Sequence, residues 1–479
     1  MQAQSLTTLV SGKTTIPAAA LEALAAGLRG SLIGEGDGAY DDARTIWNGM
    51  VDRRPGLILR CAGAADVIAA VNLARDNGLL VAVRGGGHGI AGNAVCDGGL
   101  MIDLSPMRSV RVDVASQRAW VEPGATLADV DKETQAFGLA VPTGINSTTG
   151  IAGLTLGGGF GWLTRKFGLT LDNLLSVDVV TADGELRRAS QSENPDLFWA
   201  LRGGGGNLGV VTAFEFQLHR VGPEVLSGLV VHPFDDAERV LRAYRRELEA
   251  APDEMTCWAV LRQAPPLPFL PEEWHGREIV VLAMCYCGDM QAGEKAAAGL
   301  RAIGTPIADV VGPHPFTGWQ QAFDPLLAPG ARNYWKSHDL VELSDAAIDI
   351  LLNAIRNLPG PECEIFIGHV GGAAGRVAPE ATAFPQRSSH FVINVHARWR
   401  TPDMDQACIG WARALFEAMK PHAVGTAYIN FMPADEPDRV QAAYGGNYRR
   451  LAELKQLYDP MNLFRMNQNV TPAATSHAA

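Results

Sequence analysis

Long hydrophobic runs are missing from this 479-residue sequence, and nothing in it is long enough to span a bilayer as an apolar helix. It also lacks an early segment that combines a basic start, an apolar core and a small-residue cleavage site, so we expect a cytoplasmic protein. Cysteine is scarce, since only seven residues are spread from Cys61 to Cys408. An odd, scattered set argues against a disulfide framework. Cys285 and Cys287 stand too close together for paired metal ligands and no second pair follows them, so we expect no metal site.

The sequence has fewer basic than acidic residues. Lysine and arginine number 40 against 52 aspartates and glutamates, which gives a formal net charge of −12. This balance argues against nucleic acid or an anionic membrane as the main partner, and it favours a small-molecule substrate. The 47% of hydrophobic and 19% of charged residues are typical of a soluble globular enzyme. The length predicts two domains rather than one.

Glycine is abundant and gathers in three runs, Gly85–Gly87, Gly157–Gly159 and Gly203–Gly206. The first run follows an apolar strand and ends on His88. Consecutive glycines leave backbone N–H groups unshielded, so such a loop curls readily around a phosphate. Three runs spread over the first half of the chain therefore predict several loops that converge on one long ligand with a diphosphate.

Hydrophobic periodicity predicts an α+β fold, in which hairpins alternate with helices. In the first half we expect strands at 56–61, 79–83, 99–104 and 209–218, helices at 64–76, 127–137 and 195–201, and hairpins at 110–122 and 176–189. Before residue 40, only a helix at 18–28 is expected to be ordered. The second half predicts helices at 237–250, 291–303, 345–357 and 405–419, with strands at 279–286, 364–370 and 391–397.

The composition changes near residue 220, and motif-like residues return near the C-terminus. We therefore predict that residues 221–430 form a substrate domain, a sheet with helices on one face. It would be inserted into a cofactor domain made of residues 1–220 and 431–479.

The pattern G-x-G-x-x-G occurs at Gly87, Gly89 and Gly92. A turn-rich stretch follows it, where a dinucleotide-binding βαβ unit needs a helix, so we reject that interpretation.

Several motifs, in order along the chain, resemble one family of flavoproteins. The Arg84–His88 segment, residues 143–161 and 203–212, and the C-terminal stretches 444–451 and 458–464 with Gln468 are similar to the FAD-binding domain of vanillyl-alcohol-oxidase-like (PCMH-type) proteins. The similarity is strongest to the berberine-bridge-enzyme-like branch and its bacterial hydroxynicotine-oxidase type. It implies a two-subdomain PCMH-type FAD-binding domain with an inserted substrate domain, an antiparallel sheet covered by helices.

The resemblance implies FAD bound covalently through His88, whose neutral imidazole attacks the activated 8α carbon of the flavin. Such a bond raises the reduction potential. Read from the residues alone, His88 is a plain loop histidine or a metal ligand, although no partner stands nearby at ligand spacing. Many relatives carry a second link through a cysteine at the position of Asn146, four residues before Gly150. We therefore expect a single attachment, which argues against the oligosaccharide oxidation of doubly linked relatives.

Further FAD contacts follow from the same resemblance. The residues it implies are Arg84, Gly85, Gly86, Gly87, Gly89, Thr143, Gly144, Asn146, Gly150, Gly153, Gly157, Asn207, Val211, Asn447 and Tyr448. Taken without the resemblance, residues 150–161 are a buried glycine-rich turn, and residues 203–206 are a packing loop.

The catalytic base is harder to assign. Relatives often use the first tyrosine of an aromatic-aromatic-Gly-x-Asn motif, but Asn447 sets a register in which Ala443 occupies that position and Tyr444 the next. The usual base is thus absent. A buried Lys336 beside Tyr334 could serve, and the alternative is a lysine on a surface strand.

Three more candidates lie in the second half of the chain. His369 ends an apolar run, and Tyr428 and Asn430 match a Tyr-x-Asn strand that enters the site in the family. For lone histidines such as His390 and His396, a structural role is the commoner one.

These observations predict an FAD-dependent oxidase that moves a hydride from a small organic substrate to singly linked FAD and then to O₂, giving H₂O₂. Two alternatives stay open: a dehydrogenase that uses a quinone or protein acceptor, and a catalytically silent metabolite-binding protein. Amine, alcohol, sugar and phenol substrates all remain compatible with the sequence, as do a monomer and a dimer.

Overall fold

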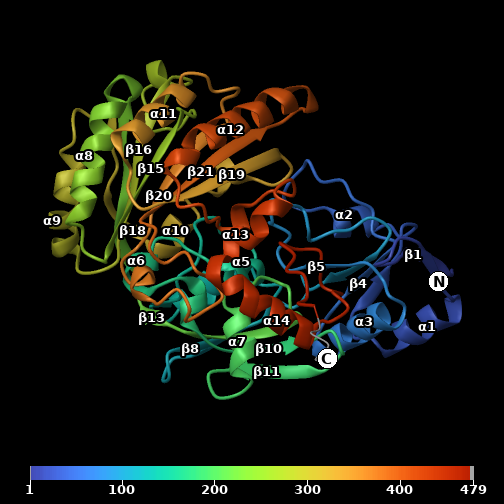
Figure 1. Ribbon diagram of the computed structural model, residues 1–479. Helices are drawn as coiled ribbons and strands as arrows, with labels where there is room; N and C mark the ends of the chain where they lie inside the picture. The colour runs from blue at the N-terminus through green and yellow to red at the C-terminus, as the bar shows by residue number, and fades with distance from the viewer. Residues whose placement is uncertain (1, 475–479) are drawn as a thin grey trace.

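Three large β-sheets organise the computed structural model, which describes residues 2–474 (Figure 1). Two of them, with four and five strands, come from the part of the chain that holds the glycine runs. The third has eight strands and is built from residues 224–399. This combination of mixed and antiparallel sheets with helices confirms the predicted α+β class.

The four-stranded sheet carries the first glycine run. Its order is β3-β4-β6-β5, and β6 pairs in parallel with both β4 and β5. The strands are β3 (Ser31–Ile33), β4 (Leu57–Arg60), β5 (Val81–Arg84) and β6 (Leu100–Asp103). Helix α3 (Ala64–Asp76) links β4 to β5, and its Val67, Ala70, Val71 and Ala74 are completely buried. Apolar residues spaced three and four apart form one buried stripe, which is why the predicted helix 64–76 is confirmed.

The five-stranded sheet is antiparallel, and the third glycine run precedes its central strand β12 (Val210–Gln217). Its order is β11-β10-β12-β8-β7, with β7 (Val110–Asp113), β8 (Arg118–Val121), β10 (Leu174–Val180), β11 (Leu186–Ser190) and β12 (Val210–Gln217). Both predicted hairpins are present. Helix α4 (Leu127–Gln135) begins with a capping box between Thr126 and Asp129, two side chains that satisfy backbone N–H groups of the first turn.

The C-terminal helices α13 (Val440–Tyr444) and α14 (Tyr448–Tyr458) pack beside α7 (Pro195–Leu201) and the five-stranded sheet (Figure 1). Ala443, Tyr444 and Leu451 share a buried cluster with Phe198 and Phe214. The end of the chain therefore returns to the part that carries the glycine runs.

The eight-stranded sheet is antiparallel, in the order β17-β14-β16-β15-β20-β21-β19, with β18 paired to β14. Its strands are β14 (Glu224–Pro233), β15 (Met255–Gln263), β16 (Glu278–Tyr286), β17 (Ala308–Asp309), β18 (Gly312–Pro315), β19 (Arg332–Leu340), β20 (Glu364–His369) and β21 (Phe391–Trp399). Four helices cover one face (Figure 1): α8 (Ala237–Glu249), α9 (Met290–Arg301), α11 (Asp345–Ile355) and α12 (Asp405–Met419).

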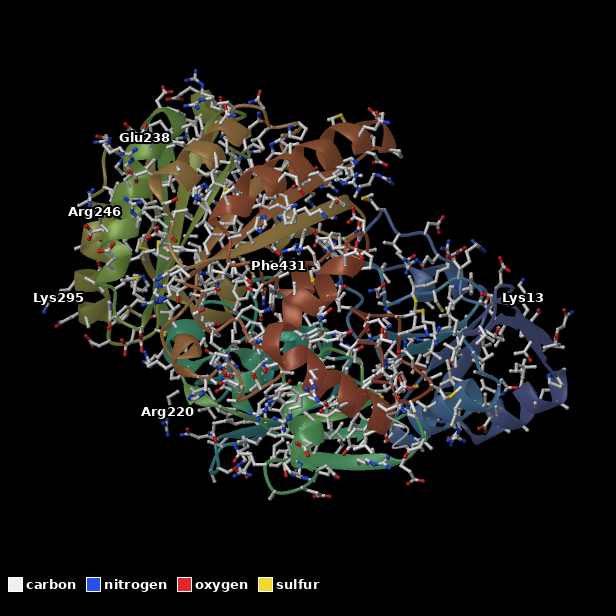
Figure 2. All side chains as sticks on the ribbon, viewed as in Figure 1. Lys13, Arg220, Glu238, Arg246, Lys295 and Phe431 are labelled. Atoms are coloured by element: carbon white, nitrogen blue, oxygen red, sulfur yellow. The ribbon has the colours of Figure 1, made fainter. Side chains whose placement is uncertain are left out.

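Alternation along the strands gives this sheet two different faces. Ile365 and Ile367 of β20 pack in the core under the helices. Phe366, between them, belongs to a separate aromatic cluster with Trp258 and Phe160. In Figure 2, the labelled Phe431 lies between the two halves of the molecule, whereas the labelled charged side chains lie at the periphery. The uncovered face therefore turns toward the glycine-bearing sheets.

Three expectations about local structure are wrong. Strands β1 (Gln4–Thr7) and β2 (Lys13–Ile16) form a hairpin before the expected helix α1 (Ala18–Gly27), where no order was predicted. Residues 151–157 form helix α5 (Ile151–Gly157) rather than a turn. Residues 429–431 form one turn of 3₁₀ helix (Ile429–Phe431), so the expected strand through Tyr428 and Asn430 is absent.

The remaining elements are short. They are the helices α2 (Tyr40–Arg44), α6 (Thr164–Phe167) and α10 (Phe316–Gln320), and the strand pair β9 (Leu139–Ala140) with β13 (His219–Arg220). Between residues 2 and 474, no helix is long and apolar enough to cross a membrane.

Candidate active site

A cavity of about 380 Å³ lies between the glycine-rich loops and the uncovered face of the eight-stranded sheet. Its wall includes the first glycine run, the loop at 144–150, residues 205–211, the C-terminal segment 464–468 and aromatic side chains of the sheet. This volume falls within the range of sites for small molecules and cofactors.

The glycines keep the wall of this cavity free of side chains. A Cβ placed on Gly86 would lie 2.4 Å from the Cα of Gly150, so these two loops approach backbone to backbone. Gly153 and Gly206 also line the cavity, and a Cβ there would meet no protein atom within 4 Å. Any larger residue at these two positions would occupy the cavity itself. The residues present therefore fit a long ligand held close to the backbone, as the cofactor FAD is.

His88 lines this cavity with its imidazole stacked on Trp47, 4.4 Å between ring centroids. Its Nε2 lies 3.1 Å from Oγ1 of Thr148. The Thr148 hydroxyl donates to Oδ1 of Asn146 at 2.7 Å, and the Thr148 backbone N–H donates to the same oxygen at 3.1 Å. Because that hydroxyl proton is used, Thr148 accepts from Nε2–H, and Nδ1 keeps the lone pair of the neutral ring. Burial lowers the pKa of His88 to about 3, so the imidazole is neutral at pH 7.

Tyr428 and Asn430 also line the cavity. The Tyr428 oxygen accepts from the Gly159 N–H at 2.9 Å and from Nδ2 of Asn430 at 3.0 Å. Burial raises the pKa of Tyr428 to about 12, although both hydrogen bonds oppose the rise. The phenol is therefore protonated, and its O–H remains available as a donor rather than as a base. Asn430 lies against Gly157, where a Cβ would come within 2.2 Å of Oδ1.

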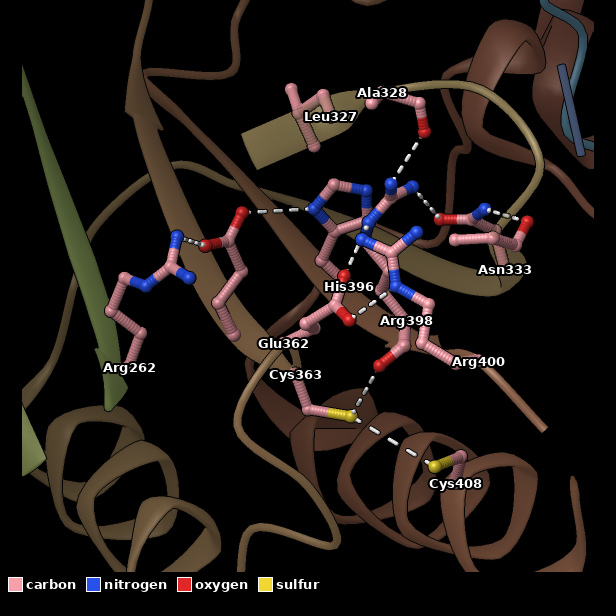
Figure 3. Close-up of polar contacts among 12 residues, drawn as sticks. Arg262, Leu327, Ala328, Asn333, Glu362, Cys363, His396, Arg398, Arg400 and Cys408 are labelled. Carbon is pink, nitrogen blue, oxygen red and sulfur yellow. Dashed lines mark hydrogen bonds and ion pairs between the residues drawn. The ribbon is translucent and has the colours of Figure 1, made fainter. Parts of the chain in front are cut away.

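Three polar side chains of the eight-stranded sheet form a row, in which Glu364 and His396 line the cavity and Arg262 lies behind Glu364 (Figure 3). Arg262 Nη1 contacts Oε2 of Glu364 at 2.6 Å, and the other carboxylate oxygen accepts from Nδ1 of His396 at 2.9 Å. Although burial opposes it, Arg262 and His396 together lower the pKa of Glu364 to about 2. Burial lowers the pKa of His396, against the opposing effect of Glu364. Within this row, the ionised carboxylate of Glu364 therefore accepts a hydrogen bond from the neutral imidazole of His396.

Comparisons with known proteins agree with this geometry. Residues 55–190 match a family model described as FAD binding domain, and residues 427–471 match one described as berberine and berberine like. An FAD-linked oxidoreductase of Dictyostelium discoideum is 33% identical over 89% of this chain and 91% of its own length. The chain belongs to the berberine-bridge-enzyme-like family of FAD-linked oxidoreductases.

Two further similarities extend this family assignment. The (R)-6-hydroxynicotine oxidase of Paenarthrobacter nicotinovorans is 30% identical over 93% of this chain and 97% of its own length. Among solved structures, 6-hydroxy-D-nicotine oxidase from Arthrobacter nicotinovorans superposes with a TM-score of 0.84 at 29% identity, covering 93% of this chain and 99% of that one. Like these berberine-bridge-enzyme-like relatives, the protein has a PCMH-type FAD-binding fold.

Many of the residues predicted for the FAD site of this family member line the cavity. They are Gly85, Gly86, Gly87, His88, Gly89, Gly144, Asn146, Gly150, Gly153 and Val211, together with the catalytic candidates Tyr428 and Asn430. The glycine motifs and the residues close to them in sequence were sufficient to find this half of the site.

Six other predicted FAD residues lie behind the wall rather than in it. Four of them bond to the backbone or to another side chain. Arg84 donates to the Ala43 carbonyl, Thr143 accepts from Gln320 at 3.0 Å, Asn207 donates to the carbonyls of Gly204 and Gln468, and Asn447 donates to those of Pro379 and Thr382. Tyr448 packs against a buried cluster, and Gly157 is covered by Asn430. These residues support the loops that form the wall, and a direct contact between them and FAD stays a prediction.

Lys336 and Tyr334 lie on the helix-covered face of β19, away from the cavity. Lys336 Nζ contacts Glu436 at 2.7 Å, and the Tyr334 hydroxyl donates to Asp435 at 2.8 Å. Trp335, between them, is the residue of this strand that lines the cavity. Both alternatives for Lys336 are therefore wrong, because it is neither a base at the cavity nor a lysine on a surface strand. It forms a buried ion pair.

His369 also lies outside the cavity wall. Its Nε2 is 3.0 Å from Nη1 of Arg165, and burial together with that guanidinium lowers the pKa of His369 to about 3. The imidazole is committed to a contact between α6 and the sheet, which contradicts the catalytic role predicted for it.

Sequence reasoning missed most of the cavity wall outside the glycine loops. The residues not foreseen include Trp47, Trp258, Trp335, Glu364, Asn394 and His396. Alternation in 391–397 places Asn394 and His396 on one face, which is a usable signal. The sequence did not show which face the helices leave uncovered.

Proposed function

We propose that this FAD-linked oxidoreductase is an oxidase, in which FAD is bonded to the protein only through His88 and electrons pass from a small organic substrate to O₂, giving H₂O₂. The observation that carries the proposal is His88 itself. It follows a side-chain-free glycine loop on the cavity wall, its ring is neutral, and its Nε2–H is committed to Thr148. This arrangement supports Nδ1 as the nucleophile in the proposed attachment.

Attachment at a single point is supported by Asn146, which lines the cavity where doubly linked relatives carry a cysteine. None of the seven cysteines, all within the described residues, belongs to the cavity wall. Each of them is buried elsewhere, and burial raises the pKa of thiols such as Cys61 and Cys96, which keeps them protonated.

The two halves of the molecule would divide the work. We propose that residues 1–220 and 431–479 bind FAD through the glycine loops, and that residues 221–430 hold the substrate. FAD supplies the two-electron acceptor. Trp258, Trp335 and Phe366 exclude water from the substrate side, and the Tyr428 hydroxyl donates a hydrogen bond that orients the substrate.

Acid precipitation tests the attachment. We expect the precipitate to stay yellow and the tryptic peptide 85–108, which contains His88, to carry the mass of FAD. His88→Ala should release the flavin into the acid supernatant while much of the non-covalent binding persists, because the glycine-loop contacts remain. Flavin released by acid from the unmutated protein, or found on a cysteine, would overturn single attachment through His88.

Reoxidation of the reduced protein in air tests the use of O₂. Stopped-flow mixing should show return of the flavin absorbance within seconds, and reoxidation that takes minutes would instead indicate a dehydrogenase. A purified protein that stays colourless when FAD is added would point to a silent binding protein. The similarity to hydroxynicotine oxidase supports the first outcome.

A further inference from the structure

We propose that His396, held by Glu364 and Arg262, accepts the hydroxyl proton of an uncharged alcohol that carries an apolar ring. This assignment rests on the proposed function, since it names the base and the substrate class of the same cavity.

The position of the proton on His396 follows from its contacts. Glu364 is a carboxylate, which only accepts hydrogen bonds, so Nδ1 of His396 must carry the proton that lies between them at 2.9 Å. In the neutral ring, Nε2 then holds the lone pair. His396 is 5% exposed and lines the cavity, and Nε2 has no hydrogen-bond partner among residues 2–474. A buried, unpaired acceptor at a cavity wall is costly unless a ligand donates to it.

The other polar groups of the cavity do not compete as bases. The Tyr428 oxygen already accepts two hydrogen bonds and keeps its proton. Lys336 and His369 lie outside the wall, and His88 is assigned to the cofactor. His396 is therefore the one group of the described cavity wall with both a free lone pair and a carboxylate behind it, an arrangement that also orients histidine bases in hydrolases.

The charged side chains on the strands around His396 are already paired with one another, which favours an uncharged substrate. Glu364 of β20 is the only charged side chain in the described cavity wall, and Arg262 of β15 neutralises it. Behind His396 on β21, Arg398 is paired with Glu362 at 3.0 Å. Trp335 of β19 lies edge-on to His396, with 4.1 Å between ring centroids. Among the described residues that line the cavity, no unpaired carboxylate is left to hold an ammonium group, and no unpaired cation is left for an acid.

The presence of a base separates alcohols from amines. A neutral amine loses hydride with the help of its own nitrogen lone pair, and no proton has to leave at that moment. An alcohol becomes a carbonyl only when its O–H proton is also accepted. In the proposed step, the C–H bond breaks and hydride leaves with both electrons to FAD, which is reduced. The O–H bond breaks, its proton binds Nε2 of His396, and the remaining electron pair completes the C=O bond of the oxidised product.

Trp258, Trp335 and Phe366 give the substrate-side wall a largely aromatic surface. Such side chains stack on a ring and exclude water from the reacting hydroxyl. Asn394 of β21 also lines the cavity, and its buried Oδ1 has no hydrogen-bond partner among the described residues. A hydroxyl on a six-membered ring or next to one matches this surface.

The experiment compares His396→Gln and Glu364→Gln with His338→Gln in the flavin-loaded protein. His338 is a matched control because it is also a buried histidine of this sheet, but its Nε2 bonds to the Phe416 carbonyl on the helix-covered face. The first readout is binding rather than turnover: dissociation constants of benzyl alcohol, benzylammonium and benzoate, measured by perturbation of the flavin spectrum. We expect only benzyl alcohol to bind, and we expect His396→Gln to weaken its binding severalfold.

The second readout is anaerobic bleaching of the flavin by a panel of ring alcohols and the corresponding amines. We expect alcohols to bleach it, a loss of roughly 10²-fold or more in rate for His396→Gln, a smaller loss for Glu364→Gln and none for His338→Gln. A solvent deuterium isotope effect on bleaching should be present in the unmutated protein and reduced in His396→Gln.

Three results would overturn the proposal while leaving the proposed function intact. One is bleaching by amines but not by alcohols. Another is an unchanged bleaching rate in His396→Gln. A third is loss of acid-stable flavin in His396→Gln with normal bleaching by the linked fraction, since the pair would then serve attachment. If the unmutated protein holds no acid-stable flavin, it is the proposed attachment that fails instead.

Discussion

A completely buried ion pair at the end of α14 offers a stringent test of how the C-terminal segment is held. Lys455 Nζ contacts Oδ2 of Asp459 at 2.6 Å, and both side chains are 0% exposed. The ammonium also donates to the carbonyls of Asn207 and Phe464, while Asp459 accepts from the N–H groups of Leu463 and Phe464. The pair therefore ties the segment that lines the cavity, which includes Phe464, to the third glycine run.

Asp459→Asn should destabilise the protein by about 3–5 kcal/mol, because it leaves a buried ammonium without its counter-charge. A chain of 479 residues that unfolds cooperatively loses about 1 kcal/mol of stability per kelvin near its Tm, so Tm should fall by about 4 °C. Amide exchange at Leu463 and Phe464 should accelerate more than exchange in α3, since the two N–H groups lose a charged acceptor.

The double variant decides whether the pair acts as a unit. Lys455→Met alone should also be destabilising, but Lys455→Met combined with Asp459→Asn removes both charges and should be no worse than the poorer single variant. That outcome corresponds to a coupling of about 2 kcal/mol, measured by thermal scans of the four proteins. Strictly additive losses would refute the reasoning, because they would mean that each side chain acts without the other.

Two further predictions concern a buried acid and the cofactor cradle. Burial raises the pKa of Asp131 to about 7 from 3.8, so the native state keeps a proton that the unfolded chain loses, and stability is lost as pH rises through this window. Compared with the wild type, Asp131→Asn should gain about 2–3 kcal/mol between pH 5 and pH 8 in thermal scans, and a difference that does not change with pH would contradict this. Gly206→Leu should leave the fold unchanged but weaken FAD binding by about 1–3 kcal/mol, roughly 5- to 160-fold, when flavin content is measured in a His88→Ala background. Gly410→Leu, where an added Cβ on α12 also meets no protein atom within 4 Å, should keep its FAD, and equal losses in the two variants would mean that Gly206 does not face the cofactor.

Elements with a strong local signal could be predicted from the sequence. Helices α3 and α12 were predicted with the bounds that the structure shows, since each carries a continuous buried stripe. The hairpin β1–β2 was missed because its strands are only four residues long, too short to show an alternating pattern among small and polar residues. Helix α5 was missed because glycine disfavours helices, and here the burial of Ile151, Ala152 and Leu156 outweighs that preference.

The two halves of the site differ in predictability for a physical reason. The wall formed by the glycine loops depends on glycines, whose effect on the backbone is local and visible in sequence. The wall formed by the eight-stranded sheet depends on which face of a strand the helices leave uncovered, and a one-residue difference in register exchanges the two faces. Lys336 was chosen for its chemistry, yet its neighbour Trp335 is the residue that lines the cavity. His396 was passed over because its partner Glu364 is 32 positions away in sequence.

The two-faced eight-stranded sheet has a consequence for how such a protein diversifies. Residues such as Ile365, Ile393 and Val395 pack in the core between the sheet and its helices, so selection for stability acts on them. The alternating positions, such as Phe366 and Asn394, meet only the cavity and its aromatic lining. A new specificity can therefore arise by substitution at positions such as Phe366 and Asn394, with the helix-facing core and the glycine loops untouched.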